Sequence, residues 1–281
     1  MSSRRDRIDR EKNRLYRLKI SFEKPFKREL KRYFSQQKKR VRGGNTEIID
    51  IIPVLENHYN RIIKKMTGFS FKKNENIGRV VKNVVENRAG EQRVLLDRTT
   101  QKQIVEAERL ARKMLAESGD YNPNSSTLNK VMAGIFARLA YGRITTIAMT
   151  QTQQVVEEVR AAVVQEAQRE LFNVILTDNR ERAEELASIA EDQTSTMIAE
   201  NFERSIEYKI SILNRASKTW ATMGDKRVRK RPISHVSANG QTVAVGAPFV
   251  VGGELLMYPG DVSLGASMAN ISGCRCSVIY F

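Results

Sequence analysis

The chain has 281 residues, of which 41% are hydrophobic and 28% are charged, and it carries a formal net charge of +16. A chain of this length can bury one large core or two small ones. No apolar run approaches the roughly 18 to 20 residues that cross a bilayer, and the charged N-terminus lacks the apolar segment of a signal peptide. We therefore expect no membrane partner and a protein that stays where it is made.

The positive charge is concentrated in two short regions. Residues 1–45 hold 17 Lys and Arg against 5 Asp and Glu, and residues 215–235 hold 7 against 1. Such regions attract polyanions, because each neutralised phosphate releases counterions. We predict non-specific contacts with double-stranded DNA from Arg4, Arg5, Arg14, Arg17, Lys31, Arg32, Lys38, Lys39, Arg40, Lys226, Arg227, Lys230 and Arg231. The alternative is a solvated basic face or a solubilising arm.

The first 214 residues have a helical pattern. Residues 1–45 form a basic arm, in which apolar spacings of three, four and seven predict two amphipathic helices broken near Pro25. Residues 46–214 form a helical body, with helices predicted over 46–66, 92–118, 126–172 and 180–213. The pair Asp178-Asn179 is expected to interrupt the last two, and an all-α bundle is the economical prediction for this body.

The composition changes after Trp220, where Gly, Val, Ser and Pro replace helix formers. Short β-rich runs occur at 242–245, 248–251, 254–258 and 276–280, and Asn239-Gly240 is a hairpin-turn signal. The predicted fold class is α+β, a mostly α-helical body with a small β-rich C-terminal domain at 215–281.

The same C-terminal region carries the most specific motif of the chain. It reads W-x₄-D-x₃-R-x₅-H, then a G-Q turn, Y-P-G-D and C-R-C. The pattern resembles the C-terminal domain of phage head morphogenesis proteins, the minor head proteins similar to the Mu F protein and the SPP1 minor head protein. The matching positions are Trp220, Asp225, Arg229, His235, Gly240, Pro259, Gly260, Asp261, Cys274, Arg275 and Cys276.

This resemblance implies a structural virion component that is not an enzyme and needs no cofactor. Such a protein binds the phage portal protein, the major capsid protein and packaged DNA, and it aids capsid assembly and DNA delivery. Its location would be the capsid interior near the portal, after assembly in the host cytoplasm. In the family an Ile-Ala helix precedes the tryptophan, and both Ile147-Ala148 and Ile189-Ala190 fit it.

His235, Cys274 and Cys276 are the sharpest chemical candidates. One imidazole and two thiolates could supply three zinc ligands, with Asp261 or water as the fourth, although zinc sites commonly use C-x₂-C spacing. Without metal, the two reduced thiols would pack on the last strand as small buried groups. A Cys–His nucleophile would make the protein a nucleic-acid-acting enzyme, and a bound metal would make it a metal-stapled interaction module.

The segment between the tryptophan and the histidine has a structural interpretation. Asp225 and Arg229 are four residues apart and could form a salt bridge that orders this segment. We expect Trp220 to anchor the C-terminal domain, rather than to take part in catalysis.

Overall fold

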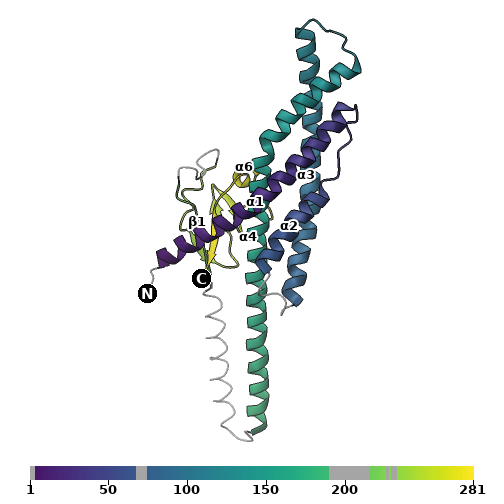
Figure 1. The fold of residues 1–281 in the computed structure, drawn as a ribbon. Coiled ribbons are helices and arrows are strands. Elements are labelled where there is room, and N and C mark those ends of the chain that lie inside the picture. Colours follow the sequence, from purple (N-terminus) through teal and green to yellow (C-terminus); the bar gives the residue numbers. More distant parts are fainter. Residues whose placement is uncertain (1–3, 68–74, 190–215, 226–227, 229–232) are drawn as a thin grey trace. The chain divides into compact units, whose positions relative to one another are not determined.

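The computed structural model describes residues 4–67, 75–189, 216–225, 228 and 233–281. The fold is α+β, with long helices followed by short antiparallel strands (Figure 1). The elements are α1 (Arg4–Arg42), α2 (Ile52–Thr67), α3 (Glu75–Glu117), α4 (Ser125–Ile189), β1 (Ser217–Ala221), β2 (Thr242–Ala244), β3 (Phe249–Val251), β4 (Glu254–Leu256), α6 (Met268–Ile271) and β5 (Ser277–Tyr280). Within the described residues, no helix is both long and apolar enough to cross a membrane.

The chain divides into two compact units. The helical unit comprises Asn13–Val156 and Ile271–Arg275, and the β-rich unit comprises Met1–Lys12, Glu157–Asn270 and Cys276–Phe281. Two long helices, α1 and α4, contribute residues to both units. The three-part division into 1–45, 46–214 and 215–281 remains a prediction.

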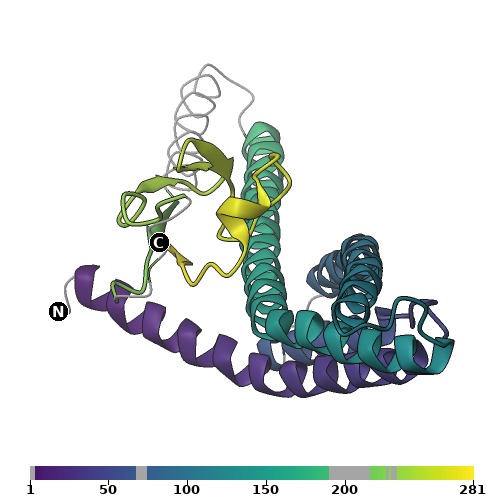
Figure 2. The same cartoon turned by 90° about the horizontal axis from the view of Figure 1, so that it is seen from above.

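The first helix is continuous, so the predicted break near Pro25 is wrong. Figure 2 shows α1, in purple, as one continuous helix. Pro25 lies inside it. Proline removes one helical hydrogen bond. On either side of it, however, Phe22 and Phe26 are almost fully buried. Packing of this apolar face outweighs the local preference of the proline, as tertiary contacts often do.

The connection between α1 and α2 is held by side chains of α1. Gln37 donates to the carbonyl of Glu47 and accepts from the amide of Ile49 (2.9 Å each), and the Tyr33 hydroxyl donates to the Ile49 carbonyl at 2.9 Å. These contacts keep the connection extended. Helix α2 therefore begins at Ile52, where Asp50 accepts from the first amide, and the predicted start at residue 46 is wrong.

Helices α3 and α4 are both longer than predicted. Helix α3 begins at Glu75 instead of residue 92. Helix α4 is capped by Asn124, which accepts from the amide of Thr127 at 2.8 Å, and it continues through Asp178-Asn179 to Ile189. The predicted interruption is wrong because neither residue blocks helical geometry as proline does. The part of the predicted 180–213 helix beyond Ile189 lies outside the described residues.

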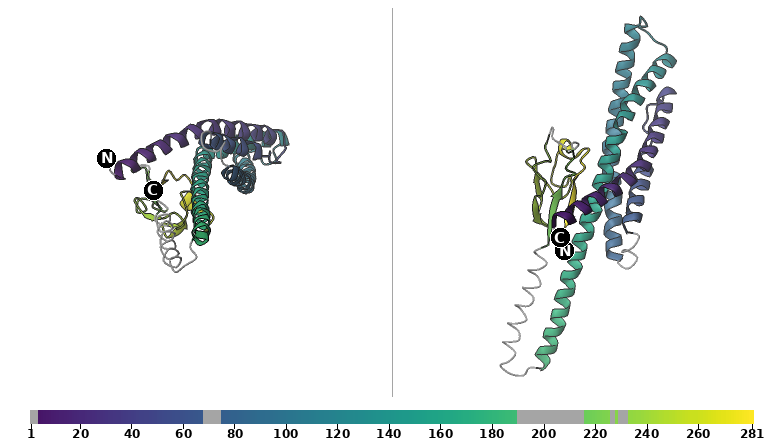
Figure 3. Two further views of the ribbon diagram at one scale, coloured as in Figure 1. Left: turned by 90° about the horizontal axis from the view of Figure 1, so that it is seen from below. Right: turned by 60° about the vertical axis from the view of Figure 1, so that its left-hand side comes forward.

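The helical unit contains a buried polar chain. Helices α2 and α3 lie side by side in it (Figure 3). The Tyr59 hydroxyl donates to Gln151 at 2.6 Å, and the Gln151 amide donates to Gln92 at 2.7 Å. His58 Nε2 lies 3.0 Å from the Thr152 hydroxyl, and the imidazole stacks on Phe26 with ring centroids 3.8 Å apart. The hydrogen-bonded groups of this chain favour one packing arrangement of the helices, whereas His58 Nδ1 is buried without a hydrogen-bond partner among the described residues.

Acidification is expected to destabilise this unit through His58. Burial, and secondly the Arg61 charge, lower the pKa of His58 to about 3. The unfolded chain, with a histidine pKa of about 6.5, therefore binds more protons between pH 6.5 and 3. The contribution of neutral His58 to the free energy of unfolding is fully present above about pH 6.5. It falls as the pH decreases, by up to about 1.4 kcal/mol per pH unit.

Urea denaturation of the wild type and of His58→Gln between pH 7 and 4.5 tests this expectation. The glutamine variant has no imidazole to protonate and should show a shallower decline of the free energy of unfolding. Parallel pH profiles of the two proteins would contradict the assignment to His58.

The β-rich unit contains two antiparallel sheets, with strand orders β2-β1-β5 and β3-β4. The four predicted β-rich runs contain β2, β3, β4 and β5, but β1 at Ser217–Ala221 was not predicted. Central strand β1 pairs Trp220 with Val278 on β5 and Thr219 with Thr242 on β2. From α4, Arg160 donates to the Val278 carbonyl at 2.8 Å and ion-pairs with Glu157 at 2.9 Å. Strand β5 is thus held by its pairing with β1 and by Arg160 of α4.

Strands β3 and β4 form a tight hairpin. Its two-residue turn is Gly252-Gly253, with φ of 61° and 85°, as a type I′ turn requires. A Cβ atom at Gly252 would lie only 1.9 Å from Cγ2 of Ile233, which lies two residues before His235. The backbone of the hairpin therefore packs directly against the segment that carries the motif histidine.

Candidate functional site

The motif residues Trp220 and Gly240-Gln241 form one backbone-bonded cluster in the β-rich unit. The Trp220 amide donates to the Gln241 carbonyl, and the Gly240 amide donates to the Trp220 carbonyl, both at 2.8 Å. Gly240 has a φ of 84°, a conformation that favours glycine. Asn239-Gly240 forms the predicted turn, but it does not join two strands in a tight hairpin, because β1 ends at Ala221 and β2 begins at Thr242.

Trp220 is the centre of this cluster. Its side chain is fully buried, and its ring meets His235 and Phe249 edge-on, with centroids 6.1 and 5.3 Å away. Edge-to-face packing of this kind adds to the energy of burial. The tryptophan joins strand β1 to the histidine segment and to strand β3.

Tyr258-Pro259-Gly260-Asp261 forms a second turn. The Asp261 amide donates to the Tyr258 carbonyl at 3.1 Å, and Gly260 has a φ of 91°. The buried Asp261 carboxylate accepts from the amides of Met257 and Ser263, both at 2.8 Å. Asp261 is not in the group of neighbouring ligand atoms formed by His235 and the two cysteines, so its predicted role as a fourth metal ligand is wrong.

Lys218 lies beside this turn. It is buried on β1, and its ammonium group donates to the Met257 carbonyl at 2.8 Å. Burial lowers the pKa of Lys218 to about 8, against the opposing effect of the negative Asp261. Sequence reasoning did not single out this lysine, because its strand, β1, was not expected.

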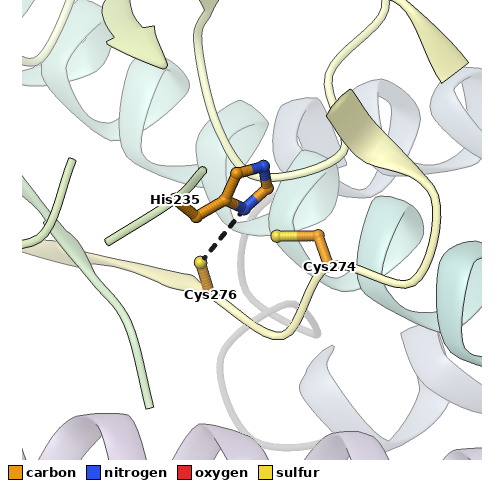
Figure 4. A group of neighbouring side chains, drawn as sticks. All are labelled: His235, Cys274 and Cys276. Atoms are coloured by element: carbon orange, nitrogen blue, oxygen red, sulfur yellow. Dashed lines mark hydrogen bonds between the residues drawn. The ribbon is translucent and has the colours of Figure 1, made fainter. Parts of the chain in front are cut away.

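His235, Cys274 and Cys276 lie together, as the sequence predicted for a possible metal site. Cys276 Sγ is 3.6 Å from His235 Nδ1, and the three ligand atoms all lie within 4.8 Å of one another. Figure 4 shows the Cys274 sulfur directed toward the imidazole ring. The three residues are at most 3% exposed, and both cysteines are present as thiols rather than as a disulfide. The sequence predicted that the two cysteines lie on the last strand. They instead precede that strand, β5, which begins at Ser277.

Asn270, on the short helix α6, fixes the orientation of His235. His235 Nε2 lies 2.8 Å from Asn270 Oδ1. The Asn270 amide nitrogen donates to the Val251 carbonyl at 2.8 Å and to the Glu254 carboxylate at 2.9 Å. The Asn270 oxygen must therefore accept, so His235 Nε2 carries the proton. In the neutral imidazole, Nδ1 then presents its lone pair toward Cys276.

Sequence reasoning missed Asn270 and Glu254. Hydrogen bonds from Ser267 and Asn270 lower the pKa of Glu254, which keeps the carboxylate charged. Neither residue belongs to the recognised motif, and neither has a spacing that indicates a contact with His235. The contact exists because the β3–β4 hairpin and α6 fold against the histidine.

The order thiol, imidazole, amide is also the arrangement of Cys–His–Asn nucleophiles. Here the imidazole could take the Cys276 proton, and Asn270 could hold the ring. Cys276 is only 3% exposed, however. A substrate would reach its sulfur only after movement of the surrounding loops.

The remaining motif residues have separate surroundings. Asp225 lies in a bend, where its carbonyl accepts from the Val228 amide at 3.1 Å. Its predicted partner Arg229 lies outside the described residues, as do Lys226, Arg227, Lys230 and Arg231. The Arg275 guanidinium lies over the Tyr16 ring, 4.8 Å from its centroid.

The second candidate site is the basic stripe, a row of exposed cations on α1 in the helical unit. At 100° per residue they share one helix face, opposite the apolar residues. The stripe consists of Arg14, Arg17, Lys24, Arg28, Lys31, Arg32, Lys39 and Arg42. Sequence reasoning missed Lys24, Arg28 and Arg42, although their i, i+3 and i+4 spacing is visible in the sequence.

The other predicted DNA contacts on α1 lie off the stripe. Lys38 and Arg40 are half-buried, and Arg40 pairs with Glu47 at 3.6 Å. Arg4 and Arg5 are exposed, and the Arg4 guanidinium lies 4.5 Å from the centroid of the Phe281 ring.

A hollow of about 720 Å³ opens on the stripe. It is lined by Lys31, Arg32, Ser35, Gln36, Lys39 and Tyr141. Within the described part of the chain, no carboxylate forms an ion pair with its three cations. The lining is therefore cationic and suited to anions such as phosphate.

Comparison of the chain with protein-family models, with curated proteins and with solved structures finds no match. The resemblance to head morphogenesis proteins therefore rests on the motif residues themselves.

Proposed function

We propose that the protein is a phage minor head protein, a structural component that works beside packaged DNA. The strongest support is that motif residues far apart in the sequence contact one another in the folded chain. Trp220, His235 and Gly240 pack or bond together, and His235 also meets Cys276. The motif residues thus form the core of a small β-rich unit, which explains their spacing without catalysis.

The basic stripe supports the second part of the proposal, non-specific contact with DNA. Its cations extend from Arg14 to Arg42 on α1, about 42 Å at 1.5 Å per residue. Lysine and arginine in such a row neutralise backbone phosphates without reading bases. The proposed protein partners are the portal protein and the major capsid protein. The proposed location is the capsid interior.

Mass spectrometry of purified phage particles, with a pull-down against the portal protein, tests the function. The particles must come from the genome that encodes this chain. We expect the chain in intact particles at a few copies and in complex with the portal. Its absence from particles would overturn the proposal.

The thiol–imidazole–amide order favours one alternative, an enzyme that acts on nucleic acid. In this alternative, phage growth requires a reaction that His235 and Cys276 catalyse. A His235→Gln variant that folds and still yields infectious particles would remove it. Turnover of a nucleic acid by the wild type, lost with Cys276→Ser, would favour it.

A further inference from the structure

We propose that His235, Cys274 and Cys276 bind one Zn²⁺ ion. The ligand atoms are His235 Nδ1 and the two sulfur atoms. The head-morphogenesis proposal does not require a metal, so this inference goes beyond it and stands or fails separately.

The distances fit a tetrahedral zinc ion. With Zn–S of about 2.3 Å and Zn–N of about 2.1 Å, tetrahedral ligands lie about 3.6 Å apart for S and N, and about 3.8 Å for two sulfurs. Cys276 Sγ and His235 Nδ1 are 3.6 Å apart. All three atoms lie within 4.8 Å of one another, so binding requires shifts of about 1 Å at most. Only Arg275 separates the cysteines, so both sulfurs come from one loop.

The surroundings of His235 are those of a metal ligand. Ligating histidines donate their other ring N–H to an oxygen acceptor, which fixes the ring. His235 Nε2 does so to Asn270 at 2.8 Å, and Asn270 is itself held by Glu254 and by the Val251 carbonyl. This outer shell leaves Nδ1 pointing at the sulfurs. The imidazole is thus held by Asn270, whose amide nitrogen is in turn held by two acceptors.

The charge of the complex suits a buried position. Zinc binding removes one proton from each thiol, so Zn²⁺ with two thiolates and a neutral imidazole carries no net charge. A neutral cluster avoids the cost of an unpaired buried charge. The three protein ligands leave the fourth tetrahedral position to a water molecule.

Cobalt substitution in the purified full-length chain tests the site directly. The chain has two cysteines and two histidines in total. Any thiolate-to-cobalt charge-transfer band must therefore come from Cys274 and Cys276. We expect one Zn²⁺ or Co²⁺ per chain and tetrahedral cobalt bands with two thiolate ligands. A protein that binds no cobalt, or binds it without a thiolate band, would overturn the proposal.

Single variants assign the ligands. Cys274→Ser and Cys276→Ser should each reduce metal affinity at least 100-fold, and Asn270→Ala should reduce it about 10- to 100-fold by loosening the imidazole. His58→Gln removes the other histidine, which lies in the helical unit, and should keep one metal per chain. Unchanged metal content in Cys274→Ser would overturn the three-ligand assignment. Because the wild-type cobalt spectrum is independent of these variants, a variant that misfolds does not prevent a decision.

Discussion

Replacing Trp220 with alanine is expected to lower the free energy of unfolding by about 3–5 kcal/mol. The side chain is fully buried on central strand β1, and its ring packs against His235 and Phe249. Alanine would leave a cavity at the place where these contacts meet. Because Trp220 is the only tryptophan, far-UV circular dichroism in urea is the appropriate measurement for both proteins.

A matched control separates packing from a general effect of truncation. Val236→Ala removes an apolar side chain that is 50% exposed near the same histidine, and it should change stability by less than about 0.5 kcal/mol. A loss below about 1 kcal/mol for Trp220→Ala would contradict the role of the tryptophan as the centre of the β-rich core.

Removing three charges from the basic stripe is expected to weaken DNA binding by about 10²–10³-fold near 0.1 M salt. The variant is Lys31→Gln, Arg32→Gln and Lys39→Gln, which strips the cations from the hollow. Each lost phosphate contact should reduce the slope of log K against log salt by about 0.9. Fluorescence anisotropy with a duplex of mixed sequence, measured across salt concentrations, gives both quantities.

The control variant removes the same charge elsewhere in the helical unit. Arg98, Lys102 and Lys130 are exposed on α3 and α4, and their replacement by glutamine should cost far less affinity. Equal losses in the two variants would mean that only net charge matters. A wild type whose affinity does not change with salt would contradict DNA binding by the stripe.

The sequence predicted those elements whose local pattern agrees with their packing. The Val-rich runs after Trp220 contain β2, β3, β4 and β5, and the apolar spacing of residues 1–45 marks a helix. The failures arise where distant contacts decide. Phe22 and Phe26 pack strongly enough to carry α1 through Pro25, and Gln37 keeps residues 47–49 extended. Strand β1 depends on β2 and β5, and the latter lies about sixty residues further along the chain.

The candidate site was predictable only in part, for the same reason. His235, Cys274 and Cys276 have residue types that suggest shared chemistry, and they do lie together. Asn270 and Glu254 are ordinary residues in sequence, and only the folded hairpin and α6 bring them to the imidazole. Asp261 was expected, as an alternative to water, to be the fourth ligand, but its carboxylate accepts hydrogen bonds from the backbone of its own turn.

The turn between β3 and β4 implies that two neighbouring glycines differ in the variation they tolerate. Both have positive φ, but a Cβ at Gly252 would collide with Ile233, whereas one at Gly253 would meet no atom within 4 Å. Asn or Asp, which accept this backbone conformation best after glycine, should therefore be tolerated at 253 and rejected at 252. In a saturation library selected for folded protein, position 252 should remain glycine, whereas position 253 should also accept Asn and Asp.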